Sequence, residues 1–144
     1  MDNVMRISEA ASLAMHAMVY LARAGRDARC STREIAGVLK ASEHHLSKVL
    51  QRLSRTGMVR SFRGIGGGFA LVRPADEISL LEVFEAIEGG FKPRICLFPE
   101  KVCQGETCIL GSLIESHNRE LLEHLRGNKL SELTGVYGAH PERV

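Results

Sequence analysis

Two short amphipathic helices that are separated by a turn of only two residues constrain the fold of this chain more than any other feature. The first follows a capping box at residues 31–34, in which the Ser31 hydroxyl accepts from the backbone N–H of Glu34 and the Glu34 carboxylate reaches back to Ser31. This helix ends near Lys40, and Ser42 caps the second helix. The second helix buries a stripe formed by Leu46, Val49, Leu50 and Leu53. The pair predicts a helix-turn-helix unit.

A glycine-tipped hairpin follows the second helix directly. Residues 58–63 alternate in polarity and predict a strand, residues 64–68 carry the glycine run, and residues 69–72 predict the returning strand. A dinucleotide-binding loop would need a third glycine at the position of Phe69 and a helix after it, so that function is not expected. A hairpin with Arg63 at its tip, beside such a helix pair, is typical of a winged helix-turn-helix.

Further helices flank this unit, so the expected fold is mostly α with a small β-hairpin wing. Residues 7–24 predict a helix capped by Ser8, and a capping box at residues 79–82 opens a helix that ends at Gly89. A long C-terminal helix is expected over residues 107–126, and it carries one apolar seam formed by Leu110, Ile114, His117, Leu121 and Leu125. That seam suits packing along another long helix, and a second copy of the chain is the natural partner.

These elements predict three parts in the chain. Residues 1–90 form a winged helix-turn-helix DNA-binding domain, residues 91–107 form a cysteine-containing sensor loop, and residues 108–144 form a dimerisation helix and tail. The tail is expected to be loose from Gly138 onwards.

The charge distribution identifies the expected partner of the helix-turn-helix unit. Residues 44–75 contain six basic residues and no Asp or Glu, whereas the rest of the chain carries 13 basic against 17 acidic residues. A local basic block on a weakly acidic body is the footprint of polyanion binding. Double-stranded DNA is therefore the expected partner.

The second helix and the wing supply the candidate DNA contacts. Phosphate contacts, which position a protein on the duplex, are expected from Lys48, Arg52, Arg55 and Arg63. Base edges are usually read from the first turns of such a helix, and there His45 and Ser47 are the preferred base readers. Arg63 could also enter a minor groove. The full candidate set is Ser42, His44, His45, Ser47, Lys48, Arg52, Arg55, Arg63 and Gly64.

Three of the four cysteines lie in one short segment, with the spacing Cys96-x6-Cys103-x4-Cys108. Thiolates grouped this closely bind a metal or a cluster together, or they exchange disulfides. Cys108 would lie at the start of the expected long helix, where the helix dipole favours a thiolate. Cys30 stands apart and is not expected to take part.

The expected compartment is a reducing cytosol. The first residues, 1–6, are not followed by the apolar stretch and small-residue cleavage site of a secretory leader, and no apolar run is long enough to span a bilayer. In such a compartment clustered cysteines are ligands or redox sensors more often than structural disulfides.

The chain resembles the IscR/NsrR/CymR-type family of bacterial winged-helix transcriptional regulators. Besides the cysteine triplet, the resemblance rests on Arg6-Ile7-Ser8, Ile35-Ala36, Leu46-Ser47-Lys48-Val49-Leu50, Leu53, Gly57-Met58-Val59, Arg63-Gly64-x-Gly66-Gly67-Gly68-Phe69-x-Leu71, Ile78-Ser79-Leu80 and Ile87-Glu88-Gly89. It implies a homodimer clasped by the C-terminal helices, with its recognition helices in successive major grooves of a partly palindromic operator. It also implies that, in the cluster-bearing members, the cysteine loop ligates a 2Fe–2S or 4Fe–4S centre that changes DNA affinity.

The resemblance leaves the fourth cluster ligand open. In one branch of the family it is a histidine three residues after the last cysteine, but Gly111 stands at that position here. In another branch it is an acidic residue in the first helix of the partner protomer, and the alignment places Ser12 there. Glu9 and His16 lie one turn to either side of Ser12, and His16 is preferred because neutral imidazole suits iron.

Three functions remain to be compared. The first is a regulator whose operator affinity depends on an iron–sulphur cluster at Cys96, Cys103 and Cys108. The second is a cluster-free regulator with direct thiol sensing or a signal from a partner protein. The third, a small iron–sulphur electron carrier, has no need of a recognition helix. An enzyme is not expected, because the chain shows no nucleophile with a paired base and no carboxylate pair placed for acid–base work.

Overall fold

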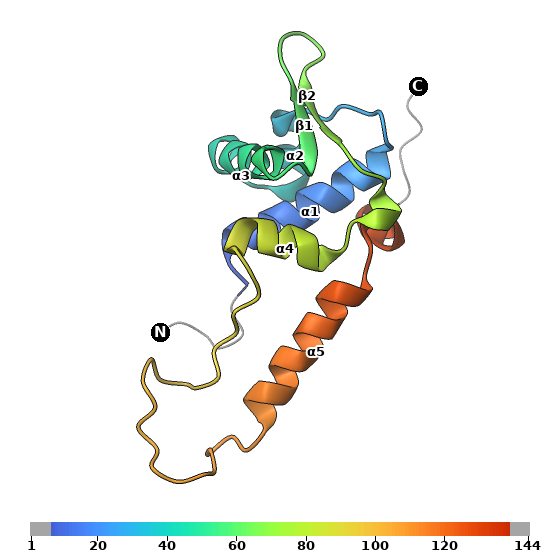
Figure 1. The fold of residues 1–144 in the computed structure, drawn as a ribbon. Coiled ribbons are helices and arrows are strands. Elements are labelled where there is room, and N and C mark those ends of the chain that lie inside the picture. Colours follow the sequence, from blue (N-terminus) through green and yellow to red (C-terminus); the bar gives the residue numbers. More distant parts are fainter. Residues whose placement is uncertain (1–6, 139–144) are drawn as a thin grey trace.

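The computed structural model describes residues 7–138, and its helices follow the order expected for a winged helix-turn-helix (Figure 1). Arg6 of the sequence motif and the tail beyond Gly138 lie outside the described residues. The elements are α1 (Glu9–Ala24), α2 (Thr32–Leu39), α3 (Glu43–Arg55), β1 (Val59–Phe62), β2 (Gly68–Leu71), the 3-10 helix η1 (Ala75–Glu77), α4 (Leu80–Glu88), α5 (Leu113–Gly127) and the 3-10 helix η2 (Leu130–Tyr137).

Helix α1 forms the centre of the core. Ser8 caps it as predicted, because the Ser8 hydroxyl accepts from the Ala11 N–H at 3.1 Å. Small and apolar side chains cover much of its circumference, and it packs against α2, α3, α4 and η2. Ala14, Met18 and Leu21 are completely buried. A helix that is apolar on most sides must be enclosed by others, as this one is.

The helix-turn-helix unit is confirmed, with one difference in its first cap. The Ser31 hydroxyl accepts from the Glu34 N–H at 3.0 Å, but the Glu34 carboxylate accepts from the Tyr20 hydroxyl at 2.9 Å. The reciprocal half of the capping box is therefore replaced by a link from α2 to α1. Lys40 takes the left-handed conformation at the end of α2, and Ser42 caps α3 by accepting from the His45 N–H at 3.3 Å.

The wing is a two-stranded antiparallel hairpin, with Val59 opposite Leu71 and Phe62 opposite Gly68. Cys30 pairs with β2 through an isolated one-residue antiparallel bridge, because Cys30 and Phe69 exchange backbone hydrogen bonds of 2.9 and 2.8 Å. Only glycine fits at position 68, since a Cβ there would lie 2.5 Å from the Cys30 carbonyl oxygen and the φ of Gly68 is +134°. The loop before α2 is thereby fastened to the base of the wing.

Helix α4 returns the chain to the core. The Ser79 hydroxyl accepts from the Glu82 N–H at 3.2 Å, as predicted, while the Glu82 carboxylate binds Arg73 at 2.8 Å in place of the expected Ser79 N–H. Val83, Phe84 and Ile87 are buried. The helix ends at Gly89, which is left-handed with φ +80°.

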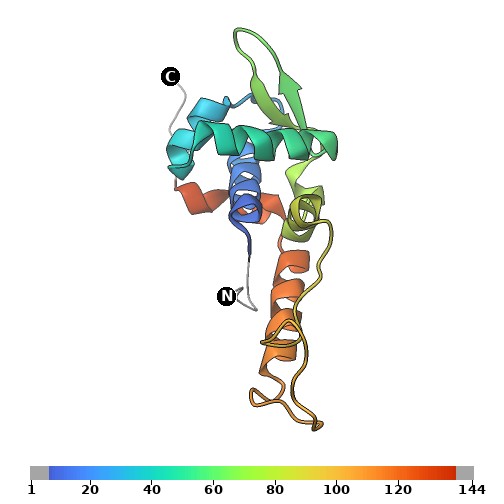
Figure 2. The same ribbon diagram turned by 90° about the vertical axis from the view of Figure 1, so that its left-hand side faces the viewer.

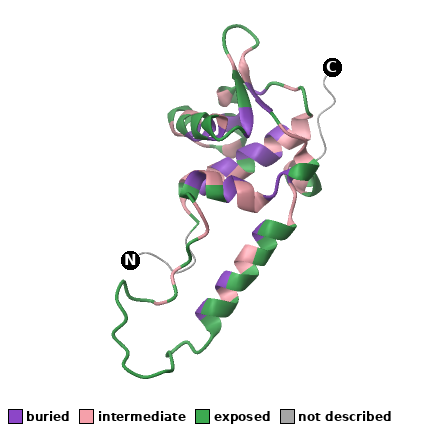
Figure 3. Cartoon of the chain, viewed as in Figure 1, coloured by how far each residue is buried: buried purple, intermediate pink, exposed green. Residues whose placement is uncertain are grey.

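Helix α5 begins at Leu113, so the expected start near Thr107 is wrong. Gly111 adopts φ +61° and interrupts the helical backbone, and the Ser112 side chain makes no cap. Leu110 consequently lies outside the seam. Ile114 and Leu125 are buried on α5, whereas its other faces are largely exposed (Figure 3). The helix projects away from the body formed by the earlier elements (Figure 1).

The last described helix packs against the first. Helix η2 packs along α1, and the Tyr137 hydroxyl donates to the His16 carbonyl oxygen at 2.7 Å. The Tyr137 and Tyr20 rings meet edge to face, with centroids 5.6 Å apart. Among the described residues, no helix is long and apolar enough to cross a membrane.

Candidate nucleic-acid interface and cysteine segment

Helix α3 presents the predicted polar face to solvent, and Figure 2 shows it lying across the body below the wing. Its apolar stripe is buried as expected, from Leu46 to Leu53. Ser42, His44, Lys48, Arg52 and Arg55 are exposed, while His45 and Ser47 are half-buried. This face therefore presents cationic and hydrogen-bonding groups to a ligand. The two preferred base readers, His45 and Ser47, are the least exposed of these side chains.

His45 lies beside the first turn of α1. Its Nδ1 atom is 3.8 Å from a Glu9 carboxylate oxygen, and the two side chains are 39% and 80% exposed. Such an exposed pair contributes little to stability. It does place Glu9, a candidate cluster ligand, next to a candidate base reader.

Arg52 is turned toward the protein as well as toward solvent. Its guanidinium donates a hydrogen bond to the Ile87 carbonyl oxygen in the last turn of α4. Carbonyl groups at the end of a helix lack partners within the helix, and a cation also interacts favourably with the negative end of the helix dipole. Arg52 therefore joins α3 to α4, a role that its position in the basic block did not indicate.

The tip of the wing is an open loop. Arg63 and Gly64 are exposed, and the Gly67 N–H donates to the Gly64 carbonyl oxygen at 3.0 Å to close the turn. Ile65 is fully exposed at the end of the loop. The predicted tip residues therefore project where a duplex beside α3 could reach them.

The cysteine segment, residues 91–112, is attached firmly only at its start. Phe91 packs on Phe84 with ring centroids 5.9 Å apart, and the Asn118 side chain donates to the Arg94 carbonyl oxygen at 2.9 Å. Beyond Cys96 every residue of the segment is exposed. The segment leaves the end of α4, swings out in a wide loop and returns to the first turn of α5 (Figure 1).

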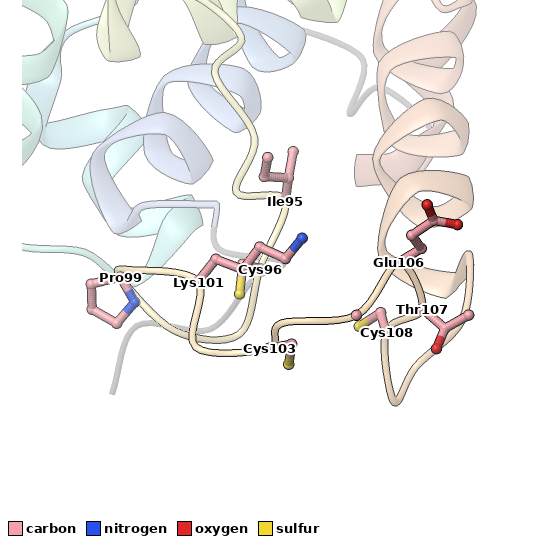
Figure 4. Close-up of a pocket in the computed structure, with 9 residues that line it drawn as sticks. Ile95, Cys96, Pro99, Lys101, Cys103, Glu106, Thr107 and Cys108 are labelled. Atoms are coloured by element: carbon pink, nitrogen blue, oxygen red, sulfur yellow. The ribbon is translucent and has the colours of Figure 1, made fainter.

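The three clustered cysteines border one open hollow of about 350 Å³ (Figure 4). Cys96 is half-buried, Cys103 and Cys108 are exposed, and all three are free thiols. Cys108 accepts a 3.5 Å contact from the Leu110 N–H, but it lies before α5 rather than in its first turn, so the expected dipole effect is wrong. Within residues 7–138 no three potential ligands lie close enough together to hold a metal ion.

The candidates for a fourth ligand are together on one face of α1. The His16 Nδ1 atom lies 2.6 Å from the Ser12 carbonyl oxygen and 3.4 Å from the Ser12 hydroxyl, and His16 is exposed. Glu9, which lies one turn before Ser12 in α1, is also exposed. In the described part of one chain, none of these three joins the cysteines in a ligand group.

Sequence reasoning missed one cationic feature. Arg26 and Arg29, in the loop before α2, lie with Arg60 of β1 around a hollow on the hairpin. The Arg29 guanidinium carbon is 3.7 Å from the centroid of the Phe62 ring. The charges come from segments far apart in the sequence, so only the pairing of Cys30 with the hairpin brings them together.

Comparison with known proteins gives one consistent result. The model of the Rrf2 family, described as an iron-dependent transcriptional regulator, matches residues 7–135. A protein of Aquifex aeolicus named as an HTH-type transcriptional regulator is 29% identical over 139 residues, which cover 94% of this chain and 96% of the relative. One of Mycobacterium tuberculosis H37Rv, named in the same way, is 31% identical over 141 residues, covering 97% and 86%.

The same comparison extends to solved structures. CymR, the global cysteine regulator of B. subtilis, superimposes with a TM-score of 0.72 at 26% identity, and the match covers 90% of this chain and 95% of that one.

Proposed function

The chain belongs to the Rrf2 family of DNA-binding transcriptional regulators, and from this premise we propose that an iron–sulphur cluster on Cys96, Cys103 and Cys108 controls its affinity for operator DNA. Its relatives are regulators, not enzymes. The observation that carries the proposal is the hollow bordered by three free thiols, in a segment that begins directly after α4. The description of the family as iron-dependent supports it further.

The donor set fits such a cluster in kind. Thiolates are the usual ligands of 2Fe–2S and 4Fe–4S centres, and three of them border one hollow. When bound, the cluster would supply a centre that responds to oxidation, iron supply or nitric oxide. Binding would require the exposed segment to draw its sulphur atoms together, so loading and ordering of residues 96–108 would be one event. The fourth ligand would be His16, Glu9 or Ser12 from the partner protomer.

We further propose a homodimer joined through α5. Large apolar side chains are exposed on α5 and on the segment before it, where they contribute no hydrophobic stabilisation to a monomer. They include Ile95 at 86% exposure, Ile109 at 85% and Leu113 at 61%. A second copy would cover these side chains and would carry its own α1 as a source of the fourth ligand. In this proposal residues 1–90 bind DNA, residues 91–107 sense, and residues 108–144 dimerise.

On the DNA side, α3 would occupy the major groove, with His45 and Ser47 at base edges and Ser42 and His44 beside them. Lys48, Arg52 and Arg55 would contact phosphates, and Arg63 and Gly64 would bring the wing to the flanking backbone or minor groove. The exposure of the basic side chains supports these roles. A regulator of this kind works where the chromosome lies, so the proposal includes the cytoplasm.

A second candidate is direct sensing by the thiols, or a signal brought by a partner protein, with no cluster. The exposure of Cys103 and Cys108 and their lack of any disulfide favour this alternative, because exposed thiols are open to oxidation. An electron carrier is not supported, since the family to which the chain belongs consists of regulators.

One preparation separates the two candidates. The wild type and Cys103→Ser are purified without oxygen, and their visible absorption and iron content are compared. The cluster proposal predicts a coloured, iron-containing wild type and a loss of both in Cys103→Ser. A colourless, iron-free wild type that still binds DNA would replace it with direct thiol or partner sensing.

A further inference from the structure

Three arginines lie together on the outer face of the wing. Arg60 and Phe62 point to one face of β1, while Val59 points into the core and is 2% exposed. Arg26 and Arg29 reach the same face from the loop between α1 and α2. Together they border a hollow of about 390 Å³, whose lining includes a single acidic residue, Asp27.

The fold holds this cluster in place. The exchange of backbone hydrogen bonds between Cys30 and Phe69 fixes the loop against β2, and the absence of a side chain at Gly68 permits that approach. Arg29 lies over the Phe62 ring at 3.7 Å. A guanidinium stacked on an aromatic ring keeps its N–H donors free at the rim of its plane. Arg29 is thus positioned by its contact with the ring and retains hydrogen-bonding capacity.

The cluster is not neutralised within the described part of the chain. Arg26, Arg29 and Arg60 are exposed, and none of them forms an ion pair with a residue of the range 7–138. Concentrated like charges of this kind raise the free energy of the folded chain unless an anion binds. The hollow is therefore suited to an anion, and planar guanidinium groups match the paired oxygens of a phosphate.

We propose that the three arginines on the outer face of the wing bind backbone phosphates of the duplex beyond the part contacted by α3 and the wing tip. This inference rests on the DNA-binding function of the family and needs no cluster. Arg60 lies in β1 and Arg63 directly follows the last residue of that strand, which places the two about 10 Å apart along the wing. A duplex that contacts the tip and continues past it would meet the three arginines next, which extends the footprint to flanking DNA.

The test compares duplexes of two lengths. The triple variant Arg26→Gln, Arg29→Gln, Arg60→Gln is titrated against random-sequence duplexes of about 10 and about 30 base pairs, which span about one and three helical turns, over a range of salt concentrations. Lys92→Gln, which removes an exposed cation outside the helix-turn-helix unit, the wing and α5, is the control. Because the arginines are exposed, melting curves should confirm that each variant is folded.

The expected result is a salt slope, for the longer duplex, that is smaller by about 2 to 3 in the triple variant, since each lost phosphate contact removes about 0.9. The shorter duplex should show a smaller change, and Lys92→Gln should match the wild type on both. A triple variant whose slope on the long duplex equals that of Lys92→Gln overturns the proposal. Lys48→Ala, measured in parallel, tests the recognition helix separately, so failure of one surface is distinguishable from failure of the other.

Inorganic phosphate provides the second arm. If the hollow served a small anion in place of DNA, the wild type would bind inorganic phosphate saturably, the triple variant would not, and the two would bind the long duplex alike. That pattern also overturns the proposal. Competition between inorganic phosphate and the long duplex in the wild type, lost in the triple variant, would support it.

Discussion

Arg52 of α3 donates a hydrogen bond to the carbonyl oxygen of Ile87, in the last turn of α4 and just before the two glycines that lead into the cysteine segment. Helix α3 is thereby tied to the helix from which the cysteine segment departs. Ser8, the cap of α1, also donates to the Glu88 carboxylate at this point. The end of α4 is thus where α1, α3 and the cysteine segment meet.

The first prediction concerns this bond. Arg52→Ala should lower the free energy of unfolding by about 1 kcal/mol, because a hydrogen bond to a charged donor is lost from a partly solvated position. Arg55→Ala serves as the control, since Arg55 is exposed one turn later on the same helix and has no polar partner among the described residues. Urea unfolding measures both. Equal stabilities of the two variants would show that the bond contributes nothing to the fold.

The second prediction separates capping from DNA contact at Ser42. Ser42→Ala should destabilise the chain by about 1 kcal/mol, because the His45 N–H loses its acceptor. Ser42→Asp should restore the stability, since aspartate also caps, yet it should weaken DNA binding by placing a carboxylate at the phosphates. Thermal melts and DNA titration measure the two effects. If Ser42→Asp bound DNA as the wild type does, Ser42 would not lie at the interface.

The third prediction tests the attachment of the loop to the wing. Gly68→Ala should destabilise by more than about 2 kcal/mol, because its Cβ would meet the Cys30 carbonyl oxygen and neither segment can move freely. Gly66→Ala is the matched control, with a positive φ of +75° but open space around its Cβ, and it should cost only about 1 kcal/mol. Chemical unfolding of both variants decides, and similar losses would argue against a close approach at Gly68.

The fourth prediction uses the two tyrosines, which are the only ones in the chain. The pKa of both Tyr20 and Tyr137 is raised to about 12, chiefly by burial, and at Tyr20 the hydrogen bond to the Glu34 carboxylate contributes to this rise. The folded state therefore holds these protons more tightly than the unfolded state, whose phenols titrate near 10. The stability they contribute is complete below pH 10 and is lost as the pH rises through 12.

Ultraviolet absorbance of the phenolate follows this titration directly. Glu34→Gln should lower the pKa of Tyr20 and should not lower that of Tyr137, because only Tyr20 faces that carboxylate. A titration in which both tyrosines ionise near pH 10 while the chain stays folded would contradict the packing of η2 on α1.

The local rules of helix capping were sufficient to predict much of this fold. Ser8, Ser31, Ser42 and Ser79 all accept the predicted backbone N–H, because a cap depends on residues only three positions away. The glutamates of the two capping boxes were predicted wrongly. The Glu34 carboxylate binds the Tyr20 hydroxyl and the Glu82 carboxylate binds Arg73, so neither returns to the backbone N–H of its capping serine. Both partners lie outside the four residues of the capping box, where a local rule does not find them.

The site was less predictable than the fold. The sequence placed the basic face of α3 correctly, since helical spacing determines it. It could not reveal the convergence of Arg26 and Arg29 with Arg60, which depends on the pairing of Cys30 with β2. The start of α5 was also missed, because the apolar seam continues through Leu110 although the backbone is interrupted at Gly111.

The fifth prediction concerns the recognition helix. Lys48→Ala should weaken binding to all duplex sequences alike and lower the salt slope by about 1, since a phosphate contact carries no sequence information. Salt-dependent titration against two unrelated duplexes measures it. A change confined to one of the two sequences would instead make Lys48 a base reader, and no change would remove it from the interface.

The central claim is that the state of the three clustered thiols determines DNA affinity. The direct measurement is the dissociation constant for operator DNA of one anaerobic preparation, before and after its iron is removed by a chelator, with the iron content of each sample recorded. We predict a change of about 5- to 150-fold, the usual range for coupled sites, and no change for Cys103→Ser treated in the same way. Equal affinities of an iron-loaded and an iron-free wild type would contradict the claim.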